Sequence, residues 1–96
     1  MNDYIIFMHD DAKEETAAAW EAYLTMLRAS GRFSGGSEIG QGVCVAAGGS
    51  PKPISAHLSG YLLVQAESIE DAKKLLVGNP TLDGGGTVEI RELPRG

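Results

Sequence analysis

The chain has 96 residues, of which 43% are hydrophobic and 22% are charged, and its formal net charge is −5 at pH 7. This length and composition are typical of one small folded domain with a modest core, and they disfavour global disorder. Because acidic residues outnumber the scattered Lys and Arg residues, 13 to 8, binding to nucleic acid or to an anionic membrane surface is disfavoured.

Cysteine use and the N-terminus indicate the compartment. The single Cys44 excludes an internal disulfide and any multi-cysteine metal site. The start of the chain lacks the basic segment and apolar core of a signal peptide, and no apolar run approaches the roughly 20 residues of a membrane span. We therefore expect a cytoplasmic protein in which Cys44, flanked by Val43 and Val45, is an inert apolar residue.

The first third of the chain predicts a strand and then a long helix. Asp3 to His9, DYIIFMH, is a compact apolar run typical of a buried strand. Asp10 or Asp11 is expected to cap the helix that follows, and Gly31 to end it. One face of this helix carries apolar residues at helical spacing: Ala17, Trp20, Leu24 and Leu27.

The middle of the chain predicts short strands separated by glycine-rich turns. Residues 33–42 favour a short, bulged strand, and residues 42–47, GVCVAA, favour another. Residues 48–53, GGSPKP, indicate a loop. Residues 54–59 are expected to begin the next strand, which then continues through the apolar run at residues 61–66.

The last third predicts a helix and a final strand. Ser68 is placed to cap the helix, with Asp71 at the position of a capping box that Glu usually occupies. Gly78 is expected to end the helix, and Pro80 to prevent its continuation. The segment Thr87 to Leu93 alternates apolar and polar residues, which indicates a strand with one buried face and one wet face.

The resulting order β-α-β-β-α-β predicts an α+β, ferredoxin-like arrangement, with both helices on one face of an antiparallel sheet. The apolar runs at residues 5–8 and 62–64 imply burial on both faces of the sheet. Because no segment remains to cover the second face, we expect a second copy of the chain to do so, giving a homodimeric α/β barrel.

At this point the chain resembles the YCII-related family, particularly its DGPF-domain branch. The pieces that carry the resemblance are DYIIFMHDD, LRASGRFSGGSEI, GYLLVQAESIEDAKKLL, the NP after the second helix, and GGGTVEIREL. They cover most of the chain. The resemblance implies one YCII-like domain over residues 1–96, a dimeric ferredoxin-like α/β barrel, and a cleft beside the sheet or between the subunits.

The chain departs from the family at two places. The Asp-Gly-Pro-Phe motif is absent, and the loop that would hold it is shortened to GGSPKPISAHLSG. Enzyme-like relatives carry a His on the first helix and an Asp before the Pro that follows the second helix, and alignment places Trp20 and Asn79 at these positions. Neither residue can perform the proton transfer of such a pair, so the family's His–Asp pair is lost here.

Two histidines remain as candidates for acid–base chemistry. His9 ends the first strand and is followed by Asp10, a carboxylate that is suited to orient an imidazole. His57 precedes a strand expected to lie antiparallel to the first, so the two rings are expected to come close. We predict His9 as the base, Asp10 as its orienting partner and His57 as a second acid–base or binding group. The opposing interpretation is that His9 is a surface residue near a helix start.

A ligand pocket and the absence of cofactors complete the sequence-based predictions. The two histidines with Asp10 or Glu38 form a conceivable metal site, but no spacing requires it, and we expect neither a metal nor a cofactor. Trp20, Tyr61 and Asn79 are candidates for a pocket, although rings such as those of Trp20 and Tyr61 are more typical of a core. The function therefore stays open between a cofactor-free isomerase or lyase and a non-catalytic ligand-binding or interaction module.

Overall fold

The computed structural model describes residues 1–50 and 52–95, so Pro51, in the loop expected over residues 48–53, and Gly96 lie outside the described residues. In chain order the elements are β1 (Asn2–His9), α1 (Ala17–Ala29), β2 (Phe33–Glu38), β3 (Leu58–Ala66), α2 (Ile69–Lys74), α3 (Pro80–Asp83) and β4 (Val88–Leu93). Across these described ranges, no helix combines the length and the apolar character that crossing a bilayer requires.

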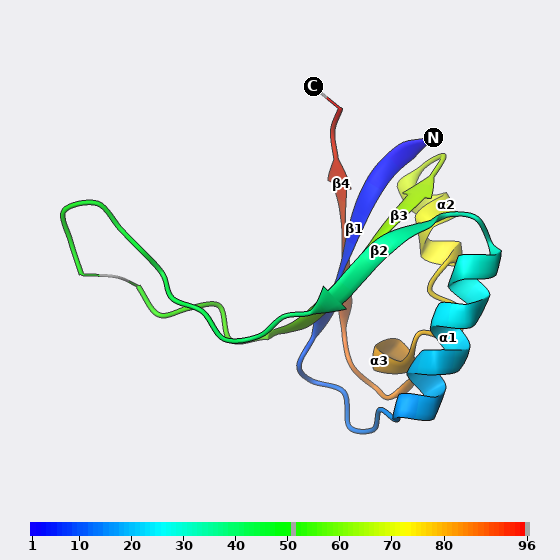
Figure 1. The fold of residues 1–96 in the computed structure, drawn as a ribbon, viewed down its shortest axis with the longest axis horizontal. Coiled ribbons are helices and arrows are strands. Elements are labelled where there is room, and N and C mark those ends of the chain that lie inside the picture. Colours follow the sequence, from blue (N-terminus) through cyan, green and yellow to red (C-terminus); the bar gives the residue numbers. More distant parts are fainter. Residues whose placement is uncertain (51, 96) are drawn as a thin grey trace.

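The four strands form one antiparallel sheet in the order β2-β3-β1-β4. This order and the helices on one side of the sheet confirm the predicted α+β architecture and are consistent with a ferredoxin-like fold (Figure 1). In the central register, Ile6 of β1 lies opposite Leu62 of β3 and Ile90 of β4. The apolar run at the start of the chain therefore becomes a central strand, paired on both sides.

The two faces of the sheet differ in what covers them. Along β1 and β3 every second side chain is buried, because alternate side chains of a strand point to opposite faces. The buried side chains meet the helices in one core: Tyr4, Ile6, Met8, Tyr23, Leu27, Leu62, Val64, Ala66, Ala72 and Leu76. We call the other side of the sheet the open face, and its apolar side chains are only half-buried: Ile5, Phe7, Tyr61 and Leu63.

Helix α1 begins later than the sequence predicts. Its N-cap is Thr16, whose hydroxyl accepts a hydrogen bond from the Ala19 backbone N–H at 3.0 Å, so neither Asp10 nor Asp11 caps it. Thr16 is the residue type that helix starts prefer, and the acidic cluster before it lies in the connecting loop. The centre of the buried stripe is Tyr23 and Leu27, which are 2% and 1% exposed.

The second helical region confirms one predicted cap and reveals an unpredicted helix. The Ser68 hydroxyl accepts from the Asp71 backbone N–H at 3.1 Å, as the capping pattern predicts. The Asp71 carboxylate reaches back to the backbone N–H of Glu67 at 3.0 Å. Pro80 does prevent α2 from continuing, but it also starts the short α3, since proline is favoured in the first turn of a helix.

The connection between β2 and β3 differs most from the prediction. β2 is short and has a register shift between Phe33 and Gly35, as expected for a bulged strand. However, residues 42–47 form no strand, and β3 begins only at Leu58. The GVCVAA pattern fails because its valines find no partner strand: Val43 and Val45 are 83% and 89% exposed. We call residues 39–50 and 52–57 the arm, and Figure 1 shows it extending beyond the end of the sheet.

Candidate functional site

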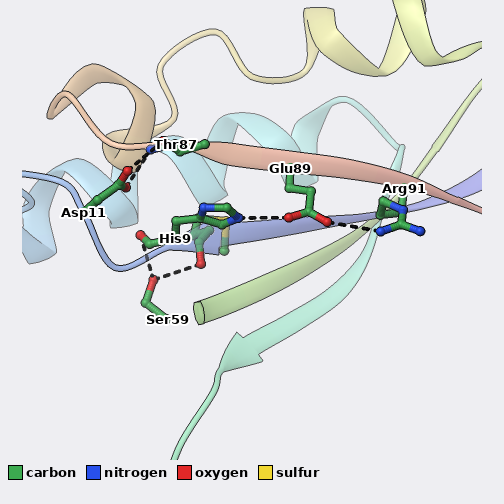
Figure 2. A network of polar contacts seen from close by, with 7 residues as sticks. His9, Asp11, Ser59, Thr87, Glu89 and Arg91 are labelled. Carbon is green, nitrogen blue, oxygen red and sulfur yellow. Dashed lines mark hydrogen bonds and ion pairs between the residues drawn. The ribbon is translucent and has the colours of Figure 1, made fainter. Parts of the chain in front are cut away.

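The two histidines lie together at the end of the sheet from which the arm extends. The ring centroids of His9 and His57 are 4.9 Å apart, with the ring planes at 80°, which confirms the predicted proximity. His9 Nε2 lies 2.9 Å from Glu89 Oε1, and Glu89 Oε2 accepts from Arg91 at 3.3 Å (Figure 2). We call His9, His57, Glu89 and Arg91 the histidine cluster.

The histidine cluster belongs to the open face. Glu89 lies opposite Phe7 in the β1–β4 register, and its neighbours Val88 and Ile90 point the other way, onto the core. His9 follows the core residue Met8 and meets Glu89 on the open side. The side chain of His9 is 22% exposed and that of Glu89 is 35% exposed, so both are accessible to a small molecule.

Glu89 is the carboxylate that partners His9. The hydrogen bond with His9 and then that with Arg91 lower the pKa of Glu89 below its ordinary value, against a smaller opposing effect of desolvation. The predicted partner was Asp10, but the structure gives the hydrogen bond to Glu89, and Asp10 contributes its backbone N–H to the His57 carbonyl at 2.7 Å. The main chain thus joins the segments that carry the two histidines.

Two side chains next to the histidine cluster fix the chain around it. Asp11 accepts hydrogen bonds from the backbone N–H and the hydroxyl of Thr87, at 2.8 and 2.7 Å. These bonds, the hydroxyl first, lower the pKa of Asp11. The Ser59 hydroxyl donates weakly to the carbonyls of Met8 and His9, at 3.3 and 3.4 Å (Figure 2). His9 is therefore positioned by contacts to β3 and to the turn before β4.

The described residues do not support the conceivable metal site. Among residues 1–50 and 52–95, no three His, Cys, Asp or Glu side chains are arranged to hold a metal ion. The histidine cluster offers two imidazoles and one carboxylate, and the carboxylate is already engaged by His9 and Arg91. What this arrangement can do is accept, hold and donate protons.

A separate cavity of ≈ 760 Å³ lies on the helix-covered side, between α1 and the strands β2 and β3. We call it the helix-side cleft. Its size is within the usual range for small-molecule pockets. Its apolar walls come from Met8, Trp20, Leu24, Phe33 and Leu62, and its lining also includes the charged residues Glu15, Glu21, Arg28 and Glu38.

Contacts on two sides hold the wall of the helix-side cleft. Trp20 Nε1 donates to Glu15 Oε1 at 3.1 Å, and the same oxygen accepts from the buried Thr81 hydroxyl at 2.6 Å. The Trp20 ring packs edge-on against Tyr23, with centroids 5.8 Å apart. Trp20 thus packs against the core, as the core interpretation of its ring predicts, and also forms a wall of the cleft.

The three predicted pocket residues separate in the structure. Trp20 and Tyr61 both border the helix-side cleft, Tyr61 from a β3 position whose side chain lies on the open face, and Asn79 is absent from the lining. Asn79 is fully buried and caps α3, its side-chain oxygen accepting from the Leu82 backbone N–H at 3.1 Å. It lies against Tyr23: burial raises the pKa of Tyr23 and the Asn79 amide opposes part of that rise. Asn79 Nδ2 is buried, and among the described residues no acceptor meets the geometry of a hydrogen bond with it.

The two candidate sites therefore lie on opposite faces of the sheet. Sequence reasoning found both histidines but missed Glu89, although the alternation of β4 placed Glu89 and Arg91 together on the wet face. The alternation of β4 does not give its pairing register with β1. That register places Glu89 opposite Phe7, two residues before His9 along β1.

Comparison with known proteins supports the fold rather than a family. No family model matches the chain, and no curated protein sequence matches it. Among solved structures, the fold is similar to that of 5-chloro-2-hydroxyhydroquinone dehydrochlorinase from Burkholderia phenoliruptrix, in a complex with 2,5-dihydroxybenzoquinone. The TM-score is 0.54 and the sequence identity 14%, over 98% of this chain and 95% of that chain. At this identity the likeness establishes a shared architecture.

Proposed function

We propose that residues 1–96 form one YCII-like domain that binds a small organic molecule and transfers a proton on it, as an isomerase or lyase does. The observation that carries the proposal is the histidine cluster, in which His9 Nε2 lies 2.9 Å from Glu89 and the His57 ring lies 4.9 Å away. The fold likeness to an enzyme of small aromatic molecules supports the same class of function.

The chemistry follows from the hydrogen bond between His9 and Glu89. With Glu89 anionic, the tautomer of His9 that carries its proton on Nε2 is favoured, which leaves the Nδ1 lone pair free to accept a proton. Glu89 then stabilises the resulting imidazolium, the role that a carboxylate partner has in other His-based sites. His57 is close enough to orient the ligand or to return a proton to a second atom.

The proposal includes a homodimer, because the open face carries both this chemistry and half-buried apolar residues. In the described residues every helix packs on the opposite face. A second copy over the open face would bury Phe7 and Tyr61 and would exclude water near the histidine cluster. Water exclusion strengthens the interaction of an imidazolium with its carboxylate.

The test of the proton-transfer function is deuterium exchange in heavy water. The probes are 2,5-dihydroxybenzoquinone, which the similar enzyme binds, and a panel of small enolisable ketones, followed by proton NMR. We expect His9→Gln to slow the catalysed exchange by about 10²–10⁴-fold. We expect Glu89→Gln to slow it less, and the matched Asp10→Asn to leave it unchanged, since Glu89 and not Asp10 bonds His9.

Two results of this experiment would overturn the proposal. One is wild-type protein that exchanges no probe faster than buffer alone. The other is a His9→Gln, His57→Gln double variant that exchanges a probe as fast as the wild type. If Asp10→Asn impairs exchange as much as Glu89→Gln does, the assignment of the partner carboxylate is wrong even though the site is right.

The helix-side cleft supports a second candidate function, that of a non-catalytic binding module. The supporting observation is that this cavity of ≈ 760 Å³ lies on the other side of the sheet from the histidine cluster. Trp20, the only tryptophan in the chain, lines it, so its fluorescence reports directly on occupancy. Binding of the same probes that changes this fluorescence, is lost when Leu24→Phe fills the cleft and is unaffected by His9→Gln would favour the module over the enzyme.

A further inference from the structure

The arm between β2 and β3 is the largest part of the molecule that makes no contribution to the core. None of its described residues is buried, and its valines, Val43 and Val45, are among the most exposed large apolar residues of the chain. Its two legs face one another, with Cys44 Sγ 3.6 Å from the Pro53 carbonyl. Figure 1 shows that it points away from both the sheet and the helices.

The size of the molecule gives a measure of this extension. A compact monomer of 10.1 kDa exposes about 5,300 Å², whereas this chain exposes 6390 Å², roughly 1,100 Å² more. The radius of gyration is 14.8 Å, against about 12.5 Å for a compact domain of this length. A specific protein–protein interface buries about 800 Å² on each partner, so the excess surface is of the size that one stable contact removes.

The open face is an apolar surface that could receive the exposed valines of the arm. Ile5, Phe7, Tyr61 and Leu63 lie side by side across the two central strands, with Ile5 opposite Leu63 and Phe7 opposite Tyr61. The arm carries one formal charge, Lys52, in addition to His57. A segment with so little charge suits an apolar surface and is poorly suited to nucleic acid or to a highly charged partner.

We propose that the arm docks on the open face of a second copy of this chain. One chain carries both an exposed apolar arm and an uncovered apolar face, so two copies that exchange arms around a two-fold axis cover both features at once. A different partner would need to supply two unrelated surfaces. This inference rests on the homodimer of the proposed function and goes beyond it by naming the segment that holds the dimer together.

The first experiment measures the dissociation constant of the dimer by sedimentation velocity for wild type, Val43→Asp, Val45→Asp and a matched control, Val77→Asp. Val77 is 71% exposed and lies in the turn after α2, away from both the arm and the open face. Burial of one valine contributes enough free energy that each arm variant is expected to weaken the dimer by at least about tenfold. Val77→Asp is expected to match the wild type.

The second experiment locates the contact. Cys44, the only cysteine of the chain, is labelled with a photoreactive maleimide in a mixture of isotopically light and heavy protein, and mixed-isotope cross-links are identified by mass spectrometry. The proposal predicts cross-links from Cys44 of one copy to β1 or β3 of the other. Cross-links only to the partner's arm or helices would contradict it.

The outcomes separate this inference from the proposed function. A wild-type protein that remains monomeric at high micromolar concentration overturns the arm exchange, as it does the dimer. A wild-type dimer that Val43→Asp and Val45→Asp leave unchanged overturns only the arm exchange. Proton transfer is judged by the deuterium exchange of His9→Gln, which neither of these results decides.

Discussion

Two neighbouring residues of one strand show how differently the two faces of this sheet are used. Ile6 is 0% exposed and packs under the helices, whereas Ile5, one residue earlier, is half-buried on the open face. The residue type, the strand and the central position in the sheet are the same. The difference teaches that the helix-covered face buries the apolar side chains that stabilise the isolated chain, while the open face leaves its apolar side chains half in water, as the proposed dimer and site require.

The polar contacts also differ between the two faces of the sheet. On the helix-covered side the polar contacts hold elements together: the Tyr23 hydroxyl donates to the Leu75 carbonyl at 2.7 Å, and Arg32 pairs with Asp71 at 2.6 Å. On the open side the His9–Glu89–Arg91 series runs from β1 to β4 and joins no helix to the sheet. A polar group on the first side is expected to affect folding, and one on the second side to affect function.

The largest expected effect is that of Ile6→Ala. It removes a fully buried side chain and should lower the free energy of unfolding by about 2–5 kcal/mol. Ile5→Ala is its matched control and should have a clearly smaller effect at low protein concentration, because the Ile5 side chain is already half in water. Urea unfolding followed by circular dichroism measures both, and equal effects of the two variants would refute the division between the faces.

Tyr23→Phe is expected to have the next largest effect. It removes the hydroxyl that joins α1 to the end of α2 and should cost about 1 kcal/mol. Tyr61→Phe removes a tyrosine hydroxyl from the open face instead. It should change the unfolding free energy much less. If the two substitutions are equally destabilising, the hydroxyl of Tyr23 has no special role in joining the helices.

The pH dependence of stability should depend on Asp71. The Glu67 backbone N–H and then Arg32 lower the pKa of this carboxyl below the ordinary value of 3.8. A carboxyl with a lowered folded pKa contributes its full stability above the unfolded pKa and loses it as the pH falls through the folded one. Asp71→Asn should therefore lose less stability than wild type on acidification, as measured by urea unfolding at neutral and acidic pH. Equal losses in the variant and the wild type would contradict this role of Asp71.

The smallest expected effect on stability is that of Glu89→Gln. Ion pairs that are open to solvent contribute little to folding, and Glu89 lies at a partly exposed surface, so the urea midpoint should stay near that of wild type while deuterium exchange slows. A large drop in the midpoint would assign Glu89 to the structure rather than to the chemistry of the open face.

The sequence predicted the parts of the fold that depend on local patterns. The strand at Ile5 to Met8, the Ser68 cap and the alternation around Glu89 all follow from spacing and residue type within a few positions. The GVCVAA segment was mispredicted because a strand needs a partner as well as a pattern, and residues 42–47 extend from the sheet instead of joining it. The Thr16 cap was missed because acidic residues at 10 and 11 offered equally good local signals.

The site was predicted in part for the same reason. Strand ends placed His9 and His57 near each other, and the distance of 4.9 Å between the ring centroids confirms this. Asp10 was predicted as the partner of His9 because it is adjacent in sequence, and Glu89 was not considered because it reaches His9 across 80 residues through the β1–β4 register. Asn79 was placed in a pocket by alignment with the family that the chain resembles, but in the structure it is buried and caps α3.

The division between the faces is tested most directly by the concentration dependence of Ile5→Ala. If a second copy covers the open face, the cost of this substitution in urea unfolding grows as the protein concentration rises from micromolar towards millimolar, because dimerisation adds stability by mass action. The cost of Ile6→Ala over the same range stays constant. A cost of Ile5→Ala that is the same at every concentration would contradict the account, since it would mean that nothing binds the open face.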